Sequence, residues 1–352
     1  MKKSDIRNVI GESILADGMS PIIDLEKSHG SWLVDKVSGK EYLDLFSMFA
    51  SLSVGYNHPY VLEQAERLKI AAINKPTNSD VYSQEMAEFV HTFKRVAQPD
   101  YLPLTFFIEG GGLAVENALK AAFDWKRRKN LAKGSSAKGE KVIHFKQCFH
   151  GRTGYTMSLT DSPDKRKTMY FPKFDWPRIT NPKITFPLEE NIDHIVELEK
   201  KAISEIKDAI AANPDNIASM IIEPIQGEGG DNHFRCRFFE KLRALADEHE
   251  FLLIYDEVQT GVGITGKMWA HQHFTPSLCP CDKTIEKEPL PDIISFGKKS
   301  QVCGILAGDR VLEAKNNVFQ RSSRINSTFG GNLTDMIRFK IISETIEEHN
   351  LL

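Results

Sequence analysis

The chain has 352 residues, of which 41% are hydrophobic and 26% are charged, and its formal net charge is −3. This is the composition of an ordinary soluble globular protein, and it gives no reason to expect nucleic acid or an anionic membrane as a partner. No apolar run approaches the length of a membrane span, and no signal-peptide core follows Lys2 and Lys3, so we expect a cytoplasmic protein. The odd count of five cysteines predicts reduced thiols and not a disulfide framework.

The order of apolar and polar residues predicts an α/β fold. Residues 31–45 alternate around Ser38-Gly39, which indicates a hairpin, and helical periodicity follows over 60–73 and 83–96. Further on, short apolar runs alternate with amphipathic stretches. Strands are expected at 104–108, 141–145, 217–222, 251–256 and 292–296, and helices at 113–127, 189–212, 234–250 and from 333 onward. This alternation predicts a mostly parallel sheet flanked by helices, with residues 160–188 as a long surface excursion.

The glycines at 110–112 follow the first of these strands after Glu109 and precede a strong helix. A strand, a glycine turn and a helix together offer free backbone N–H groups and a positive dipole end to a phosphate. Neither a Walker lysine nor GxGxxG spacing is present, so a single phosphomonoester fits better than a nucleotide. The alternative interpretation is a flexible turn at the start of a helix.

A buried acid ends the strand expected at 251–256. Asp256 and Glu257 stand at its carboxyl end, where open α/β sheets bind their ligands. A buried Asp needs a positive partner, and a protonated pyridine nitrogen is one that would serve. Lys298 follows the next apolar run and is a candidate Schiff-base lysine. The alternative is that Asp256 caps a helix and Lys298 is solvated.

Three further motifs follow strands or precede a helix. One motif, which contains Phe149, His150 and Arg152, indicates a planar ligand with an anionic group. The guanidinium of Arg152 suits a carboxylate. We interpret His150 as a hydrogen-bonded histidine and not as a general base. Glu228 is a loop carboxylate between glycines. The stretch 324–332, RINSTFGGN, carries hydroxyls and amides before paired glycines and is a further candidate anion cradle.

One cluster of possible metal ligands is set aside. His271, His273, Cys279 and Cys281 gather in WAHQHFTPSLCPCDK, but their spacing matches no zinc pattern. A surface loop with reduced thiols is the favoured interpretation, and no metal is expected.

Six motifs together resemble a family. EGGGLAVENALKAA, FHGRT, IIEPIQGEGG, YDEVQTG, SFGKK and STFGGN occur in the order found in class III, fold-type I pyridoxal-phosphate aminotransferases. Within that class, ENALKAAFDWKRR and RINSTFGGNLTDM resemble the lysine 6-aminotransferases, and Gly110–Gly112 replaces the Ser-Gly-Thr turn that most members carry.

The resemblance implies a fold and a domain division. It implies a seven-stranded, mostly parallel sheet flanked by helices, with a smaller second domain. Residues 1–57 are expected to form the N-terminal segment of the small domain, 58–327 the cofactor-binding large domain, and 328–352 the start of a helix leading to the rest of the small domain. That C-terminal part is expected to be missing.

The resemblance also implies how pyridoxal 5′-phosphate is held. Lys298 would bond covalently to the cofactor, and Asp256 would keep its pyridine nitrogen protonated. The other implied contacts are Val258 and Phe149 on the two ring faces, Gln259 at the ring hydroxyl, and Gly111 and Gly112 at the phosphate. Thr328 from a partner subunit would complete the phosphate site, which implies a homodimer.

The implied reaction transfers the ε-amino group of L-lysine to 2-oxoglutarate, giving 2-aminoadipate 6-semialdehyde and glutamate. Arg152 would hold the substrate α-carboxylate with Asn326 nearby. Glu228 would pair with a C-terminal arginine when lysine binds and free that arginine when 2-oxoglutarate binds. The alternatives are a class III enzyme acting on ornithine, 4-aminobutyrate or a diamine, and a truncated, inactive homologue.

Overall fold

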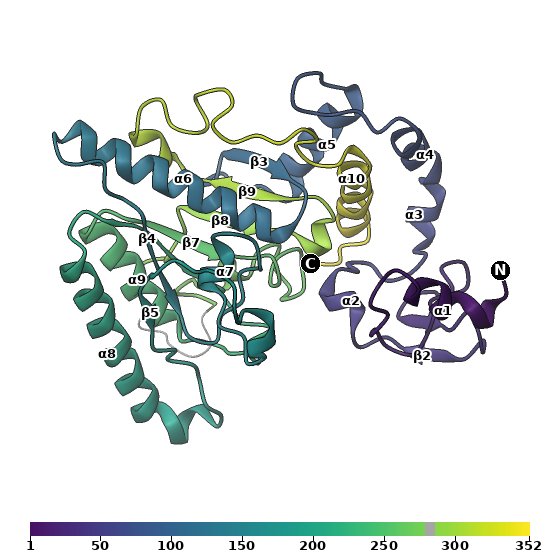
Figure 1. Cartoon of the computed structure of the whole chain (residues 1–352), viewed down its shortest axis with the longest axis horizontal. Helices are drawn as coiled ribbons and strands as arrows, with labels where there is room; N and C mark the ends of the chain where they lie inside the picture. Colours follow the sequence, from purple (N-terminus) through teal and green to yellow (C-terminus); the bar gives the residue numbers. More distant parts are fainter. Residues whose placement is uncertain (279–285) are drawn as a thin grey trace.

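A seven-stranded sheet forms the centre of the molecule in the computed structural model, which describes residues 1–278 and 286–352 (Figure 1). The strands lie in the order β3-β9-β8-β7-β6-β4-β5. Their bounds are β3 (Leu104–Ile108), β4 (Lys141–Phe145), β5 (Arg178–Ile179), β6 (Ile217–Ile222), β7 (Leu252–Asp256), β8 (Ile293–Phe296) and β9 (Cys303–Ala307). The mostly parallel sheet expected from the sequence is therefore confirmed.

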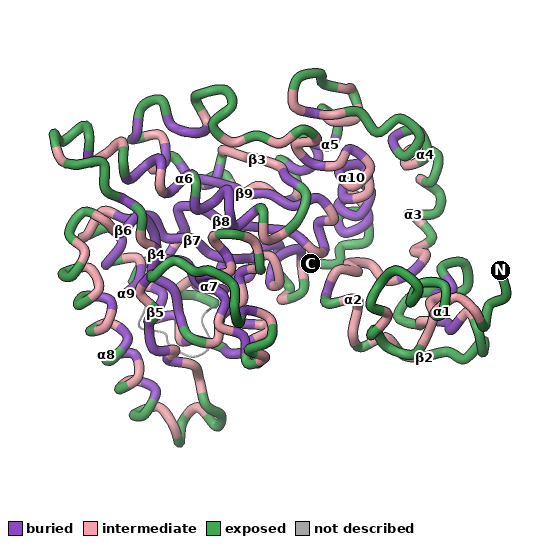
Figure 2. The backbone as a smooth tube through the Cα atoms, viewed as in Figure 1, coloured by how far each residue is buried: buried purple, intermediate pink, exposed green. Residues whose placement is uncertain are grey.

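Only β9 runs against the other strands of this sheet. It pairs antiparallel with both β8 and β3, whereas β5, β4, β6, β7 and β8 pair in parallel. The strands are mostly apolar because both faces of the sheet are covered. Along β7, Leu253 and Tyr255 pack into one core cluster, while Leu252 and Ile254 pack into the other. Figure 2 shows the sheet as the most continuously buried part of the chain.

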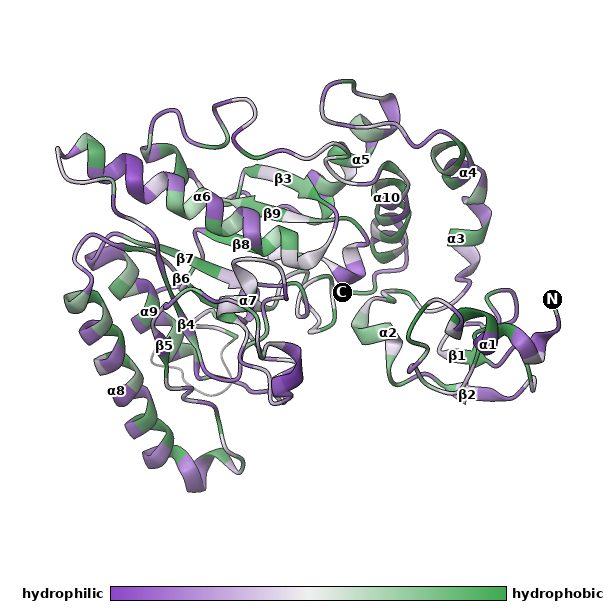
Figure 3. Cartoon of the chain, viewed as in Figure 1, coloured by the Kyte–Doolittle hydropathy of each residue, from purple (hydrophilic) through white to green (hydrophobic). Residues whose placement is uncertain are grey.

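Helices cover both faces. α6 (Gly111–Ala132) packs on β6, β8 and β9 through Val115, Leu119 and Trp125. The other core cluster holds residues of α5 (Gln84–Val96), α8 (Leu188–Ala212), α9 (Cys236–Glu248) and α10 (Leu333–Glu348). In Figure 3, α8 shows alternating hydrophobic and hydrophilic bands, as expected for an outer helix with one buried face. None of the described helices is long and apolar enough to cross a bilayer.

The N-terminal part lies beside the main body and reaches it through two short helices (Figure 1). It contains the expected hairpin. Its elements are η1 (Lys3–Asp5), α1 (Ile6–Gly11), β1 (Trp32–Val34), β2 (Glu41–Leu43), α2 (Ser47–Ala50), α3 (Pro59–Glu63) and α4 (Ala65–Ile73). The remaining short elements are α7 (Thr156–Leu159), η2 (Lys165–Lys167), η3 (Ala270–His273), η4 (Lys298–Ser300) and η5 (Asp309–Glu313). The domain division at residues 57 and 327 stays a prediction.

Four details differ from the sequence-based expectation. The helix expected over 60–73 is two helices separated at Gln64, and β9 was not expected. The stretch 160–188 is not only a surface excursion, because β5 joins the sheet edge there and buries Ile179. Cys148 and Cys303 are free and buried, but Cys236 is disulfide-bonded, so the expectation of reduced thiols is wrong for Cys236.

Candidate active site

The predicted site residues converge because the strands before them point the same way. The carboxyl ends of β3, β4, β6, β7 and β8 meet at one edge of the sheet. A side chain added at Gly111 or Gly297 would meet the Val258 methyl groups, and one added at Gly227 would meet the Gln259 side chain. The loops after β3, β6, β7 and β8 are therefore in direct contact.

Asp256 is buried at the centre of this edge. Its Oδ1 accepts hydrogen bonds from the Ser295 hydroxyl at 2.9 Å and from the Val258 backbone N–H at 3.1 Å. Its Oδ2 lies 2.7 Å from Nδ1 of His150. A carboxylate oxygen can accept more than one hydrogen bond, so Oδ2 has capacity for a further N–H donor. His150 is thus a hydrogen-bonded histidine, as the sequence suggested.

Further ionisable side chains lie around the His150–Asp256 pair. Burial alone would lower the pKa of His150, but the adjoining Cys148 sulfur and the Asp256 carboxylate outweigh it, so the pKa of His150 lies well above its ordinary value. Glu223, directly after β6, accepts the Phe149 N–H at 2.8 Å. Burial raises the pKa of Glu223 to about 7, and the negative charge of Asp256 adds to the rise while His150 opposes it.

The structure distinguishes the two adjacent lysines. Lys299 is buried, and its ammonium donates to the carbonyls of Gln259 at 2.6 Å and Ala50 at 3.3 Å. Burial and the neighbouring Lys298 lower the pKa of Lys299 to about 8. The Lys298 ammonium, in contrast, has no hydrogen-bond partner among the described residues, and burial lowers its pKa against the opposing effect of Asp256 and Glu223. Lys298 is therefore the amine free to react.

The expected phosphate cradle is present in the backbone. The first bond of α6 runs from the Ala114 N–H to the Gly110 carbonyl, so the N–H groups before it have no partner within the helix. Gly110 has a φ of 98° and supplies no side-chain cap. A Cβ on Gly111 would lie 2.9 Å from a Val258 methyl group, and one on Gly112 would lie 3.3 Å from Thr153. Side chains would fill the space that an anion needs.

Two of the predicted substrate-binding residues lie on loops at this edge. Glu228, after β6, accepts hydrogen bonds from the Ser162 hydroxyl at 2.6 Å and from the Lys167 ammonium at 2.5 Å. Arg152 is exposed on the loop after β4 and forms no hydrogen bond or ion pair within the described part of the chain. Phe149 lies on the same loop, half-buried.

Asn326 and Thr328 are not brought to the site by this single chain. Both are exposed on the segment between β9 and α10. The Asn326 side chain accepts the neighbouring Ser327 N–H, and the Thr328 carbonyl accepts the Ser79 hydroxyl at 3.3 Å. Within residues 1–278 and 286–352, neither forms a hydrogen bond to the residues around Asp256.

The His/Cys cluster shows no metal centre among the described residues. His271 is buried, with its Nδ1 2.8 Å from Glu257 and its Nε2 2.7 Å from the Tyr101 hydroxyl. His273 contacts the Thr265 carbonyl at 2.9 Å. Cys279 and Cys281 lie outside the described residues.

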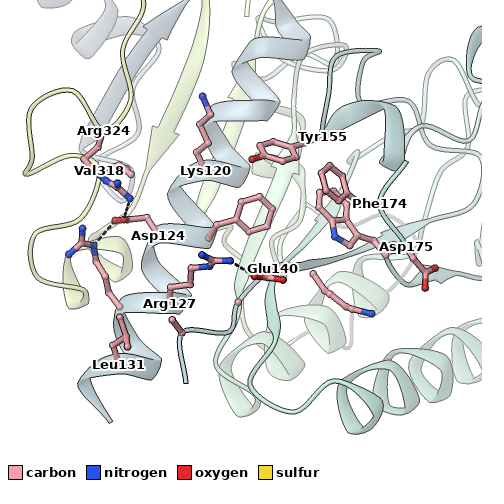
Figure 4. Close-up of a pocket in the computed structure, with 16 residues that line it drawn as sticks. Lys120, Asp124, Arg127, Leu131, Glu140, Tyr155, Phe174, Asp175, Val318 and Arg324 are labelled. Carbon is pink, nitrogen blue, oxygen red and sulfur yellow. Dashed lines mark hydrogen bonds and ion pairs between the residues drawn. The ribbon is translucent and has the colours of Figure 1, made fainter. Parts of the chain in front are cut away.

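A cavity of about 900 Å³ lies elsewhere, along the second half of α6. Figure 4 shows Asp124 beside Arg324 and Arg127 beside Glu140, each as an ion pair. None of the predicted site residues lines this cavity. Asp124, Arg127, Arg128, Glu140 and Arg324 are paired with one another there, so the residues around Asp256 remain the better candidate for chemistry.

Sequence reasoning missed several residues of the site. Glu223 carried a usable signal, because it is an acid at the carboxyl end of a buried strand, as Asp256 is. Ser295 and Lys167 carried none, since their partners are 39 and 61 residues away in the chain.

These residues fit pyridoxal phosphate. Asp256 can accept a ring N–H, the glycine start of α6 leaves room for a phosphate, and the Lys298 amine is unengaged among the described residues. The three features lie on adjacent loops of one sheet edge, as a single small ligand requires.

Comparison with known proteins agrees with this geometry. The family model for "Aminotransferase class-III" matches residues 14–352. The L-lysine-epsilon aminotransferase of Mycobacterium tuberculosis is 50% identical over 98% of this chain and 74% of its own length. The L-lysine-epsilon aminotransferase of Amycolatopsis lactamdurans is 46% identical over 99% of this chain and 75% of its own length. A structure of the M. tuberculosis lysine aminotransferase in the internal aldimine form superposes with a TM-score of 0.93 at 48% identity, covering 99% of this chain and 78% of that one. The chain belongs to the class III aminotransferases, which use pyridoxal phosphate as their cofactor.

Proposed function

We propose that this aminotransferase moves the ε-amino group of L-lysine to 2-oxoglutarate, releasing 2-aminoadipate 6-semialdehyde and glutamate. The observation that carries the proposal is the 46–50% identity to L-lysine-epsilon aminotransferases over nearly the whole chain. The unengaged Lys298 amine beside a buried carboxylate supports the chemistry.

Pyridoxal phosphate supplies an aldehyde that condenses with amines and a ring that accepts electrons from the bond being broken. Lys298 is the amine that holds it. The Lys298 amine would also take the proton from the ε-carbon of lysine, and its lowered pKa favours the neutral form that this requires. Asp256, backed by His150, holds a proton on the ring nitrogen.

The remaining binding roles follow the arrangement of the loops. Gly111 and Gly112 would bind the phosphate through backbone N–H groups, and Gln259 the ring hydroxyl. Phe149 and Val258 would pack on the two ring faces. On the substrate side, Arg152 would hold the α-carboxylate of lysine. Glu228 would pair with a C-terminal arginine when lysine binds and free that arginine when 2-oxoglutarate binds.

We further propose that the enzyme acts in the cytoplasm as a homodimer, in which Thr328 and Asn326 of one subunit serve the site of the other. Their exposed positions, with no hydrogen bond to the Asp256 cluster among the described residues, support this arrangement.

The test is the visible absorption spectrum of the chain with pyridoxal phosphate, before and after L-lysine is added. We expect a protein-bound band that lysine bleaches and 2-oxoglutarate restores, with glutamate as product. Borohydride treatment and peptide mass spectrometry should place the cofactor on Lys298. Turnover of lysine by Lys298→Ala at the wild-type rate would contradict the mechanism. Bleaching by ornithine or 4-aminobutyrate but not by lysine would contradict the assigned donor.

A further inference from the structure

Lys167, which is not among the predicted site residues, forms an ion pair with the predicted loop carboxylate Glu228. The Lys167 ammonium lies 2.5 Å from Oε1 of Glu228, and the Ser162 hydroxyl donates to the same oxygen at 2.6 Å. The Lys167 and Glu228 side chains are only 32% and 26% exposed, so water screens their attraction incompletely. The pair joins η2 to the loop after β6.

Lys167 also faces the site. Its ammonium lies 5.9 Å from the centre of the Phe149 ring, within the range of a cation–π contact. The Phe149 backbone in turn donates to Glu223, one of the carboxylates that acts on Lys298. Phe149 therefore contacts both the Lys167 ammonium and Glu223 at the centre of the site.

The second oxygen of Glu228 has no hydrogen-bond partner among the residues that the structure describes. Oε2 is buried and accepts no hydrogen bond within the described part of the chain, because both donors go to Oε1. A buried carboxylate oxygen without a donor is unfavourable by itself. Such an arrangement is expected where a ligand supplies the missing donor or where the carboxylate changes partners.

We propose that Lys167 is a positioning residue that acts through Glu228: by neutralising this carboxylate, it lets one site admit a dicarboxylate as well as a cationic amino donor. The inference rests on the proposed function, in which lysine and 2-oxoglutarate alternate in one pocket. Without Lys167, the charge of Glu228 repels a dianion but not the ammonium groups of lysine. The effect of losing Lys167 is therefore selective for the acceptor.

The direct test measures binding of glutarate, a non-reactive five-carbon dicarboxylate, to the cofactor-loaded chain by titration calorimetry. We expect Lys167→Met to weaken glutarate binding roughly tenfold, a value between those of one charge repulsion in bulk water and one near a protein surface. Lys167→Arg should bind glutarate like the wild type because the positive charge is kept. The matched control is Lys165→Met, which removes the same charge from the same short helix; Lys165 is 69% exposed and pairs with Asp161 instead. It should leave glutarate binding unchanged.

A double variant tests whether Glu228 mediates the effect. In Lys167→Met combined with Glu228→Gln, no uncompensated charge remains, so glutarate binding should recover most of the tenfold loss. Wild-type affinity in Lys167→Met, or an equal loss in Lys165→Met, would overturn the proposal. So would a double variant as weak as Lys167→Met, because Lys167 would then contact the ligand itself.

Steady-state kinetics separate this proposal from the proposed function. Lys167→Met should raise the KM for 2-oxoglutarate about tenfold and leave the KM for L-lysine unchanged, whereas a general structural defect would alter both and lower Tm. A wild-type chain that does not react with lysine would contradict the proposed function. The glutarate affinities would still decide the role of Lys167.

Discussion

His150 and Asp256 are 106 residues apart in the chain, yet their side chains meet at 2.7 Å in the buried centre of the site. Both are almost fully buried, so water screens their attraction only weakly. The contact fixes the carboxylate that would face the cofactor, and it gives the folded protein a pH dependence.

Replacing His150 by Gln should reduce stability in a pH-dependent way. The pKa of His150 is raised in the folded state, so its contribution is fully present below the unfolded value of about 6.5 and is lost as pH rises through the higher folded value. The Tm difference between wild type and His150→Gln should therefore be a few degrees at pH 6 and shrink toward pH 9. Thermal scans at the two pH values measure it. A difference that grew with pH would mean that His150 is neutral in the fold.

Replacing Gly111 by Ala should impair cofactor binding. The new Cβ would lie 2.9 Å from Val258, so that side chain or the start of α6 must move. We expect affinity for pyridoxal phosphate to fall at least tenfold, roughly the loss of one hydrogen bond to a charged group. Fluorescence titration of the cofactor-free protein measures this. Gly18→Ala is the control, because a Cβ there meets nothing within 4 Å. Equal affinities in the two variants would argue against the cradle.

Replacing Lys299 by Met should affect stability more than attachment of the cofactor. Lys299 is 3% exposed and satisfies the carbonyls of Gln259 and Ala50. Losing these bonds should lower the free energy of unfolding by about 1 to 3 kcal/mol, which denaturant titration detects. Borohydride should still fix the cofactor to Lys298 in this variant. Attachment that depended on Lys299 instead would reverse the assignment of the two lysines.

Mixing two inactive variants tests whether Thr328 acts across a dimer. Lys298→Ala removes the reactive amine, and the combined variant Asn326→Ala, Thr328→Ala removes the residues proposed to serve the partner. In a mixed dimer, one site regains both sets, so co-refolded subunits should recover about a quarter of wild-type activity. If Thr328 and Asn326 served their own chain, mixing would recover nothing.

Local patterns accounted for most of the fold and for the centre of the site. The five expected strands all form, because strands covered on both faces are mostly apolar and therefore stand out as short apolar runs in the sequence. Asp256 and the glycines at the start of α6 were recognisable because ligand-binding residues of such sheets lie at the carboxyl ends of strands. The direction of β9 and the pairing of β5 could not be predicted from the sequence, because no local pattern shows which neighbour a strand pairs with.

The sequence by itself determined the family, the cofactor class and the parallel sheet, because these follow from apolar periodicity and from short motifs kept in order. Only the tertiary structure decided how the charges are paired. The Lys299 ammonium donates to backbone carbonyls, whereas the Lys298 ammonium has no hydrogen-bond partner among the described residues, and Lys167 pairs with Glu228. Such pairings join residues far apart in the chain, and they exist only once packing has removed the groups from water, where the same charges would barely interact.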